Sequence, residues 1–377
     1  MSRPRNIRVE LGDRSYPIRI GSDGLEGLGE AVARRTKATQ VAVVTVPGVG
    51  RRYGPTVMRS LKRAGLRACR IDVPDGDSSK SLGQLRKLYD VFLDKGLDRK
   101  SVLVALGGGV VGDLTGFAAA TYLRGIPFVQ VPTTILSMVD ASIGGKTAVN
   151  LPQGKNLVGA FHQPSLVWID TTTLRSLPRR DRAAGMAEVV KAGAIWDEPY
   201  FTRLERDSER VMDLDPGALI PVLERACRIK AEVVAADERE ESGVRALLNF
   251  GHTLAHAVET QMGYRRIQHG EAVSIGMVHA ARRSEALGLA PAGTEKRLVD
   301  LLARLQLPTE IPRYDRKAHL AAIQVDKKKV GRKIHYVVLR RIGRAETVLL
   351  TPAQILPARS AGPARRDGKR SARGKTT

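Results

Sequence analysis

Short runs rich in β-branched residues alternate with helical segments through the first half of the chain, and this alternation constrains the fold more than any other feature. The runs are VAVVTV (41–46), ACRIDVP (68–74), SVLVAL (101–106) and PFVQVP (127–132). Helical stretches such as residues 81–96 separate them. The pattern is typical of a parallel sheet with helices on its faces. Two earlier runs, IRVELG and YPIRIG, predict an N-terminal hairpin.

From about Pro178 onward the chain changes to long amphipathic segments. They cover residues 180–196, 218–238, 247–261 and 271–288, and a short β-rich run follows at 333–343. Apolar residues at a period near 3.6 predict amphipathic helices. We therefore expect an α/β domain over residues 1–178, a mainly helical domain over residues 179–356 and a tail over residues 357–377.

The chain is strongly basic, with 62 Lys and Arg against 39 Asp and Glu and a net charge of +23. Such a balance makes nucleic-acid binding a first hypothesis. From Arg359 to the end, however, seven basic residues lie in a Gly- and Ser-containing stretch without apolar periodicity, which predicts a disordered tail. The other basic residues form no patch interleaved with aromatic side chains. Nucleic-acid binding is therefore not expected as the main function, and anion pockets for phosphate and carboxylate explain the charge more simply.

The compartment is indicated by the cysteines and the apolar content. Cys69 and Cys227 lie too far apart in sequence for a disulfide framework or a cysteine-type zinc site, and a reducing cytoplasm fits them best. No stretch approaches the roughly 20 apolar residues that span a bilayer. The basic start lacks a following apolar region, so no secretory signal is expected. We expect a cytoplasmic protein without a membrane partner.

A glycine cluster, GGGVVGD at residues 107–113, follows a predicted strand and precedes a predicted helix. Gly107, Gly109 and Gly112 satisfy G-x-G-x-x-G, in which glycine lets the backbone approach a pyrophosphate at a helix N-terminus. The cluster lies deep in the domain, and no acidic residue ends the next strand to hold a ribose. It predicts either phosphate binding or a plain tight turn into a helix, and it is not an ordinary Rossmann fingerprint.

A second glycine turn, DASIGGKT at residues 140–147, is a near match to a P-loop. Asp140 stands where the first glycine is required, which excludes an NTPase. Lys146 within this turn is still a candidate point charge for a phosphate or a carboxylate.

Three of the seven histidines, His252, His256 and His269, lie within 18 positions. His252 and His256 share a face of the expected helix, and His269 lies at an expected helix start. Thr253 stands where the H-E-x-x-H motif needs Glu, which excludes protease chemistry. Glu188 lies among small and apolar residues on another expected helix. Each residue alone is more often structural, but together they indicate a His₂Glu metal site with open positions for substrate.

Long motifs along the chain resemble the 3-dehydroquinate synthase family. They are GGGVVGDLTGFAAATYLRG, VPTTILSMVDASIGGKTAVN, GKNLVGAFHQP, AEVVKAG, RALLNFGHTLAHAVE, HGEAVSIGM and the late DKK. The resemblance covers residues 5–356. It implies an α/β, Rossmann-like NAD-binding N-terminal domain, a mainly α-helical C-terminal domain for metal and substrate, and a homodimer.

The resemblance also implies a set of residues for each ligand. A divalent metal, zinc or cobalt, would be bound by Glu188, His252 and His269. NAD would be held by Asp75, Gly76, Asp77, Ser78, Ser79, Lys80, Gly109, Val110, Val111, Gly112, Asp113, Thr133, Thr134, Lys146, Lys155, Thr173, Leu174, Arg175 and Ser176. The substrate would be surrounded by Asp140, Lys146, Asn156, Lys191, Lys230, Arg245, Asn249, His256, Lys327 and Lys328, and Arg124 would reach the phosphate site of the partner subunit.

The activity implied by the resemblance is conversion of 3-deoxy-D-arabino-heptulosonate 7-phosphate to 3-dehydroquinate and phosphate. This carbon–oxygen lyase reaction belongs to the shikimate pathway toward chorismate and the aromatic amino acids. It combines transient oxidation by NAD of a hydroxyl that the metal acidifies, β-elimination of phosphate, reduction and intramolecular aldol closure. Arg and Lys side chains suit the carboxylate and phosphate of such a substrate.

Two positions depart from the family pattern, both near the nucleotide ribose. Asp77 stands where the family usually has Glu, and Val46-Pro47 stands where it often places Asp or Asn. We expect a working enzyme with weaker NAD binding. Two enzyme alternatives stay open: another sugar phosphate cyclase, against which Asn249 and His256 argue, and a glycerol-dehydrogenase-like alcohol dehydrogenase.

Overall fold

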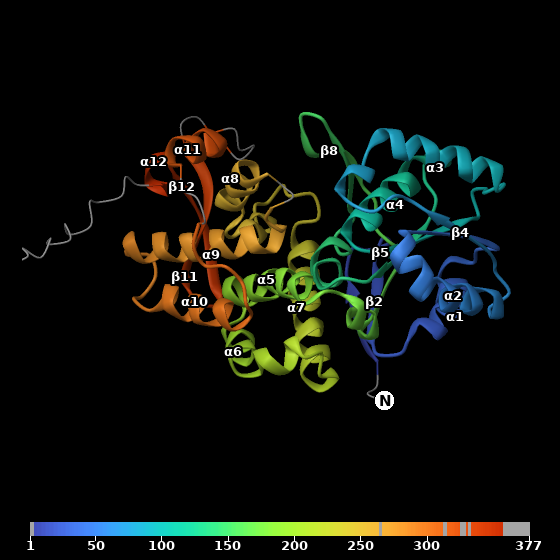
Figure 1. Cartoon of the computed structure of the whole chain (residues 1–377), viewed down its shortest axis with the longest axis horizontal. Helices are drawn as coiled ribbons and strands as arrows, with labels where there is room; N and C mark the ends of the chain where they lie inside the picture. The colour runs from blue at the N-terminus through green and yellow to red at the C-terminus, as the bar shows by residue number, and fades with distance from the viewer. Residues whose placement is uncertain (1–3, 264–265, 312–314, 325–328, 331–332, 357–377) are drawn as a thin grey trace, which may run out of the picture.

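The computed structural model describes residues 4–263, 266–311, 315–324, 329–330 and 333–356. An α/β half and a mainly helical half lie side by side (Figure 1). Lys327, Lys328 and the predicted tail from residue 357 lie outside the described residues. No helix in the described ranges combines the length and the apolar character needed to cross a membrane.

A seven-stranded sheet with the order β1-β2-β9-β6-β5-β3-β4 organises the α/β half. Its strands are β1 (Arg5–Val9), β2 (Tyr16–Gly21), β3 (Gln40–Thr45), β4 (Arg67–Asp72), β5 (Val102–Gly107), β6 (Phe128–Pro132) and β9 (Leu166–Asp170). Strands β1 and β2 form an antiparallel hairpin, and every other neighbouring pair is parallel. The predicted hairpin and parallel strands are confirmed, while β9 was not among the predictions.

Helices cover both faces of this sheet, because the central strands carry apolar side chains on both faces. These helices are α1 (Leu28–Thr36), α2 (Pro47–Arg63), α3 (Leu82–Asp94) and α4 (Gly109–Thr121). Along β3, Val41 and Val43 pack into the core that holds residues of α1 and α2. Ala42 and Val44 pack into the core that holds residues of α3 and α4. The two-residue period of a strand thus divides one apolar run between two layers.

Short elements connect the strands and supply much of the irregular backbone. They are the 3₁₀ turns η1 (Leu25–Gly27), η2 (Asp77–Ser79), η3 (Tyr122–Arg124) and η5 (Thr171–Ser176) and the π-helical turn η4 (Ser137–Ala141). Strands β7 (Lys146–Leu151) and β8 (Gly154–Phe161) form a separate antiparallel hairpin. This hairpin projects from the α/β half (Figure 1) and was not predicted, because β8 lacks a buried apolar face.

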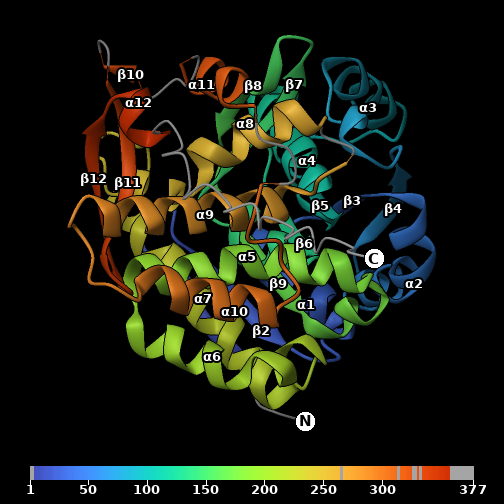
Figure 2. The same ribbon diagram turned by 60° about the vertical axis from the view of Figure 1, so that its left-hand side comes forward.

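The second half contains the four predicted helices, further helices that were not predicted, and a small sheet (Figure 2). The helical elements are α5 (Arg179–Trp196), α6 (Glu198–Met212), α7 (Pro216–Ala236), η6 (Arg245–Asn249), α8 (His252–Met262), α9 (His269–Ala286), α10 (Thr294–Arg304), α11 (Arg316–Gln324) and α12 (Pro352–Ile355). The β-rich run at 333–343 forms β11 (Lys333–Arg341), which pairs with β10 (Lys329–Val330) and β12 (Arg344–Leu350).

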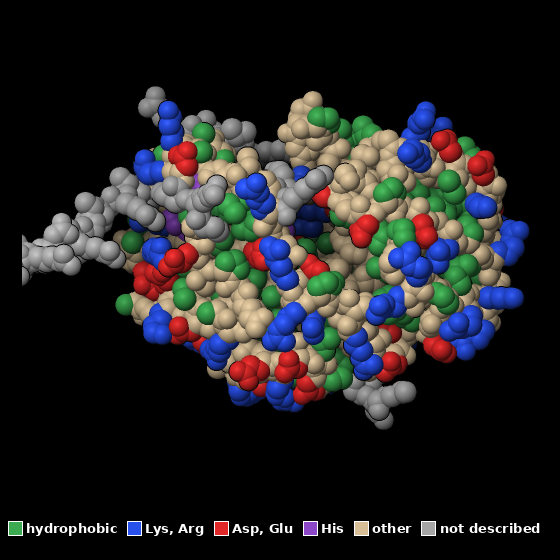
Figure 3. Space-filling model, viewed as in Figure 1, with side chains coloured by type: hydrophobic (Ala, Val, Ile, Leu, Met, Phe, Trp, Pro, Cys, Tyr) green, Lys and Arg blue, Asp and Glu red, His purple; other side chains and the backbone are tan. Residues whose placement is uncertain are grey.

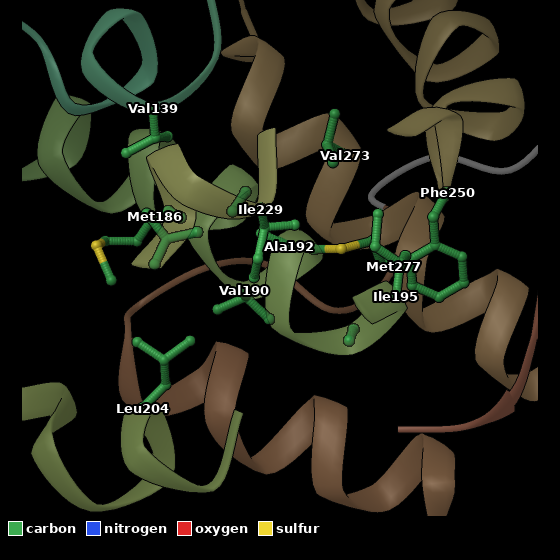
Figure 4. Close-up of a cluster of buried hydrophobic side chains, with 14 of the residues drawn as sticks. Val139, Met186, Val190, Ala192, Ile195, Leu204, Ile229, Phe250, Val273 and Met277 are labelled. Carbon is green, nitrogen blue, oxygen red and sulfur yellow. The ribbon is translucent and has the colours of Figure 1, made fainter. Parts of the chain in front are cut away.

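Helix α5 is the centre of the second half, since it is buried without a break from Ala183 to Ile195. Figure 4 shows Met186 and Val190 of this helix among apolar side chains of neighbouring elements, including Phe250 and Met277. Ile18 and Ile20 of β2 belong to the same core. The N-terminal hairpin therefore joins the two halves through shared apolar packing.

Candidate active site

Glu188, His252 and His269 come together although they lie on three different helices. Glu188 is in the middle of α5, while His252 and His269 are the first residues of α8 and α9. Their ligand atoms all lie within 4.8 Å of one another. The Nε2 atoms of His252 and His269 are 3.7 and 3.8 Å from Oε1 of Glu188. The structure thus assembles the three residues that the resemblance assigned to the metal.

The burial of Glu188 shows that these residues fit a divalent cation. The side chain is 2% exposed, and in the described part of the chain neither carboxylate oxygen accepts a hydrogen bond of ordinary geometry. Its close charged neighbour is Lys191, one turn later on α5. Burying a carboxylate is costly unless it is paired or bound to a metal. Two imidazoles and one carboxylate with open positions are a donor set that zinc accepts.

Close contacts between glycine and backbone bring the three helices together at this point. A Cβ on Gly270 would lie 1.8 Å from the carbonyl oxygen of Ala184 on α5. A Cβ on Gly276 would lie 1.9 Å from the carbonyl oxygen of Gly251, which precedes α8. Gly251 itself has φ of +81°, a conformation that glycine adopts without strain. The small residues let α9 approach both other helices closely enough for their polar residues to meet.

Hydrogen bonds orient both imidazole rings with Nε2 toward Glu188. Nδ1 of His252 lies 3.3 Å from the carbonyl oxygen of Phe250. Nδ1 of His269 lies 3.2 Å from Oε1 of Glu259 on α8. Because both partners are acceptors, each Nδ1 carries the proton and each Nε2 presents its lone pair to the site.

Basic side chains and acidic partners line the same region. Lys230 of α7 pairs with Asp140 of η4, and Lys146 at the start of β7 pairs with Glu240. Burial would raise the pKa of Asp140, but Lys230 and Lys191 hold it well below its usual range. Asp140 is therefore ionised. Figure 3 shows a hollow between the two halves with basic side chains deep inside it.

Arg245 is the largest buried cation of this group, at 1% exposure. Its guanidinium donates to the carbonyl oxygens of Glu238 and Gly144, and Nε lies 3.8 Å from a carboxylate oxygen of Glu240. Asp237 holds the backbone of this loop by accepting hydrogen bonds from the N–H groups of Glu241, Ser242 and Arg245.

The other residues assigned to the substrate lie at different distances from the metal cluster. Asn249 ends η6 just before α8, and the His256 ring centroid is 5.8 Å from that of His252. Arg124 is exposed in η3, after the C-terminal end of α4. The 13 residues of α4 separate it by about 20 Å from the glycine cluster. No contact of the described residues joins Arg124 to the metal cluster.

The segments predicted to hold NAD follow the carboxyl ends of parallel strands. They are residues 75–80 after β4, 109–113 after β5, 133–134 after β6 and 173–176 after β9. In open α/β sheets this edge is where ligands bind. Gly109 begins α4, so the glycine cluster forms the strand–turn–helix unit that can present backbone N–H groups to phosphate.

Lys80 is a buried residue that links the turn at 75–80 to neighbouring elements. It is 6% exposed and its ammonium group contacts both Asp113 of α4 and Asn156 of β8. Burial raises the pKa of Asp113 to about 6, although Lys80 acts in the opposite direction. Nearby, Lys155 lies 3.2 Å from Asp77. The turn at 75–80 is thereby fixed to both α4 and the β7–β8 hairpin.

Three polar residues of this region were not predicted. Glu259 follows His252 by seven positions and so shares its helix face, a spacing that sequence alone could have flagged. Glu240 lies in an acidic loop with no distinguishing pattern. Asn150 donates to Asp77 and accepts from the backbone N–H of Asn156, a role that depends on the unpredicted hairpin.

Comparisons with known proteins agree along almost the whole chain. The family model described as 3-dehydroquinate synthase N-terminal matches residues 70–184, and the one described as 3-dehydroquinate synthase C-terminal matches residues 185–329. A 3-dehydroquinate synthase of Symbiobacterium thermophilum is 52% identical over 347 residues, which are 91% of this chain and 96% of that protein.

Two solved structures are also similar. The 2-epi-5-epi-valiolone synthase of Streptomyces hygroscopicus with NAD⁺ and Zn²⁺ bound has a TM-score of 0.83 at 29% identity, covering 92% of this chain and 96% of that one. A 2-deoxy-scyllo-inosose synthase with carbaglucose-6-phosphate, NAD⁺ and Co²⁺ has a TM-score of 0.84 at 26% identity, covering 93% and 98%.

Proposed function

The chain belongs to the 3-dehydroquinate synthase family, and we propose that it converts 3-deoxy-D-arabino-heptulosonate 7-phosphate to 3-dehydroquinate and phosphate at the Glu188–His252–His269 site. One observation carries the proposal: the buried Glu188 carboxylate lies against the oriented imidazoles of His252 and His269, and lysine and arginine side chains lie close by. A carbon–oxygen lyase acting on a polyanion needs both features.

The residues for each ligand are those that the family motifs assign. When bound, NAD⁺ supplies the hydride acceptor and the divalent cation, zinc or cobalt, the Lewis acid. Glu188, His252 and His269 would hold the cation. The four segments at the carboxyl edge of the sheet, together with Lys146 and Lys155, would hold NAD. Asp77 retains a carboxylate that contacts Lys155, which supports a usable nucleotide turn despite the shorter side chain.

The chain's own contribution is charge neutralisation and positioning. Lys146 and Arg245 suit the substrate carboxylate, since both are cations whose shared neighbour here is the Glu240 carboxylate. Lys191 contacts Glu188, and Lys230 contacts Asp140, whose pKa the charges of Lys191 and His269 also lower. The two ammonium groups can stabilise negative charge on a substrate oxygen or a departing phosphate. Asp140, ionised and paired with Lys230, keeps that ammonium group in place.

We also propose a homodimer in the cytoplasm, with two domains divided near residue 178. Arg124 lies far along α4 from the glycine cluster, and its neighbour Leu123 is 38% exposed, as expected for a residue that contacts a second copy. The boundary lies between the end of η5 at Ser176 and the start of α5 at Arg179. Cys69 and Cys227 are free thiols, which suits a reducing compartment.

The test is phosphate release from the heptulosonate phosphate with substoichiometric NAD and added Zn²⁺ or Co²⁺, with the product identified by NMR. We expect 3-dehydroquinate and several turnovers per NAD. Absence of phosphate release by protein that has bound metal would contradict the proposal. Net accumulation of NADH with an alcohol substrate would instead indicate a dehydrogenase.

The second candidate is another sugar phosphate cyclase, which the similar valiolone and inosose synthases favour. The same assay separates the two when it is run with a heptulose phosphate that lacks the carboxylate and with glucose 6-phosphate. We expect both to be poor substrates, because Lys146 and Arg245 would then have no substrate carboxylate to pair with. Higher kcat/KM on either sugar would favour the second candidate.

A further inference from the structure

Glu259 is a buried acid that no step of the proposed function uses. It lies on α8 two turns after His252, and its side chain is 7% exposed. Oε1 lies 3.2 Å from Nδ1 of His269, the ring nitrogen on the side away from Glu188. A buried carboxylate needs a partner of this kind, and among the described residues the hydrogen bond to His269 supplies it.

The two imidazoles of the cluster have different partners behind them. His252 donates from Nδ1 to the neutral carbonyl oxygen of Phe250, only two residues away in its own segment. His269 donates to a charged carboxylate from another helix. A carboxylate behind a ligating imidazole fixes the tautomer and the ring orientation and makes the other nitrogen a stronger donor to a metal. A neutral backbone carbonyl also fixes the tautomer, but it raises the electron density of the imidazole less than a carboxylate does.

His269 is the ring that most needs this support. Its side chain is 35% exposed, whereas that of His252 is 13% exposed. Its ring contacts that of His252 edge-to-face, with centroids 5.3 Å apart, and the bond to Glu259 fixes the ring with Nε2 toward Glu188.

We propose that Glu259 is a positioning residue for the metal site, which orients His269 and strengthens its bond to the cation through the Nδ1–H···Oε1 hydrogen bond. The proposal rests on the proposed function to the extent that Glu188, His252 and His269 bind the metal. It predicts that Glu259 affects metal affinity and the ligand field, whereas a residue that only ties α8 to α9 affects folding stability.

Glu271 offers a matched control on the same helix. It lies two residues after His269, caps the start of α9 through the Gln268 N–H, and makes a two-pronged contact with Arg180. The substitution Glu271→Gln removes one negative charge near His269 without touching the Nδ1 partner. Glu259→Gln makes the same chemical change at the proposed position.

The experiment measures Co²⁺ affinity by calorimetric titration, with the visible absorption of bound Co²⁺ as a spectroscopic readout, in the full chain and three variants. We expect Glu259→Gln to weaken binding roughly 10-fold and Glu259→Ala roughly 100-fold, with a shifted Co²⁺ band in both. We expect Glu271→Gln to bind within about threefold of the parent with an unchanged band, while melting at a lower temperature because its ion pair with Arg180 is lost.

Glu259→Gln with parent-like affinity and an unshifted band would overturn the inference. Equal losses in Glu259→Gln and Glu271→Gln would also overturn it, since general loosening of α9 would then explain both. Glu259→Gln is nearly isosteric and decides the matter even where Glu259→Ala does not fold. A parent protein that binds no Co²⁺ would instead contradict the metal site of the proposed function, which separates the two failures.

Discussion

Replacing Gly270 with alanine perturbs the metal site without touching any ligand. Gly270 follows His269 on α9, and a Cβ there would lie 1.8 Å from the carbonyl oxygen of Ala184. Raising that distance to an ordinary contact of about 3.4 Å requires α5 and α9 to separate by about 1.6 Å. Both contacting groups belong to helix backbones, so no side-chain rotation relieves the clash.

A separation of this size exceeds what a metal site tolerates. Ligand distances in such sites vary by about 0.2 Å, and Glu188 and His269 lie on the two helices that must move apart. We therefore expect Gly270→Ala to lose bound Zn²⁺ and activity together. Overpacking of this kind lowers the free energy of unfolding by about 1–3 kcal/mol, which a denaturant titration resolves.

The assay is metal content by atomic emission after dialysis, with unfolding measured on the same samples. Gly48→Ala is the control, because Gly48 is an exposed helical glycine with no atom within 4 Å of the added Cβ. We expect it to keep its metal and its stability. Parent-like metal content in Gly270→Ala would refute the argument that the close approach of α5 and α9 sets the site geometry.

Three further outcomes follow from the structure. His269→Ala should abolish metal binding and turnover together while leaving NAD binding measurable by calorimetry; full activity would overturn the ligand assignment. Lys80→Met should leave Asp113 buried without its cation, raise the pKa of Asp113 above 6 and weaken NAD binding while metal content stays unchanged; unchanged NAD affinity would contradict the role given to Lys80. Burial would raise the pKa of Asp237, but backbone N–H groups of Arg245 and its loop hold it at about 2. Because the pKa of Asp237 is lower in the folded than in the unfolded protein, its ionised carboxylate stabilises the fold above pH ~4, and this stabilisation is lost as the pH falls toward 2. The difference in free energy of unfolding between the parent and Asp237→Asn should therefore shrink over that interval, and a constant difference would contradict this.

Local pattern was sufficient for most elements of the fold. Four β-branched runs became β3, β4, β5 and β6, because a buried parallel strand reads as a short continuous apolar run between turn signals. The helices that carry the cluster were likewise expected, but α5 was expected to be amphipathic and is instead buried on all sides from Ala183 to Ile195. The β7–β8 hairpin was missed because β8 is largely exposed and so has no apolar alternation to detect.

The sequence predicted the metal ligands of the candidate site better than it predicted the residues around the substrate. Glu188, His252 and His269 are marked by their residue types and by motifs of the family, and the structure brings them within reach of one cation. Arg124 is marked by the same motifs but lies away from the cluster in a single chain. Lys327 and Lys328 lie outside the described residues.

By itself the sequence determined the strand–glycine–helix unit at residues 102–121 and the place of His269 at a helix start, because both depend on neighbours within a few positions. It did not determine the start of α8 at His252, since a helix was expected from residue 247. Only the tertiary structure decided which side chains from other elements contact the residues of the site. Glu259 meets His269, Lys80 meets Asp113 and Asn156, and Glu240 meets Lys146 and Arg245. These contacts join separate elements, and their geometry depends on how closely helices approach at Gly270 and Gly276, which no local pattern encodes.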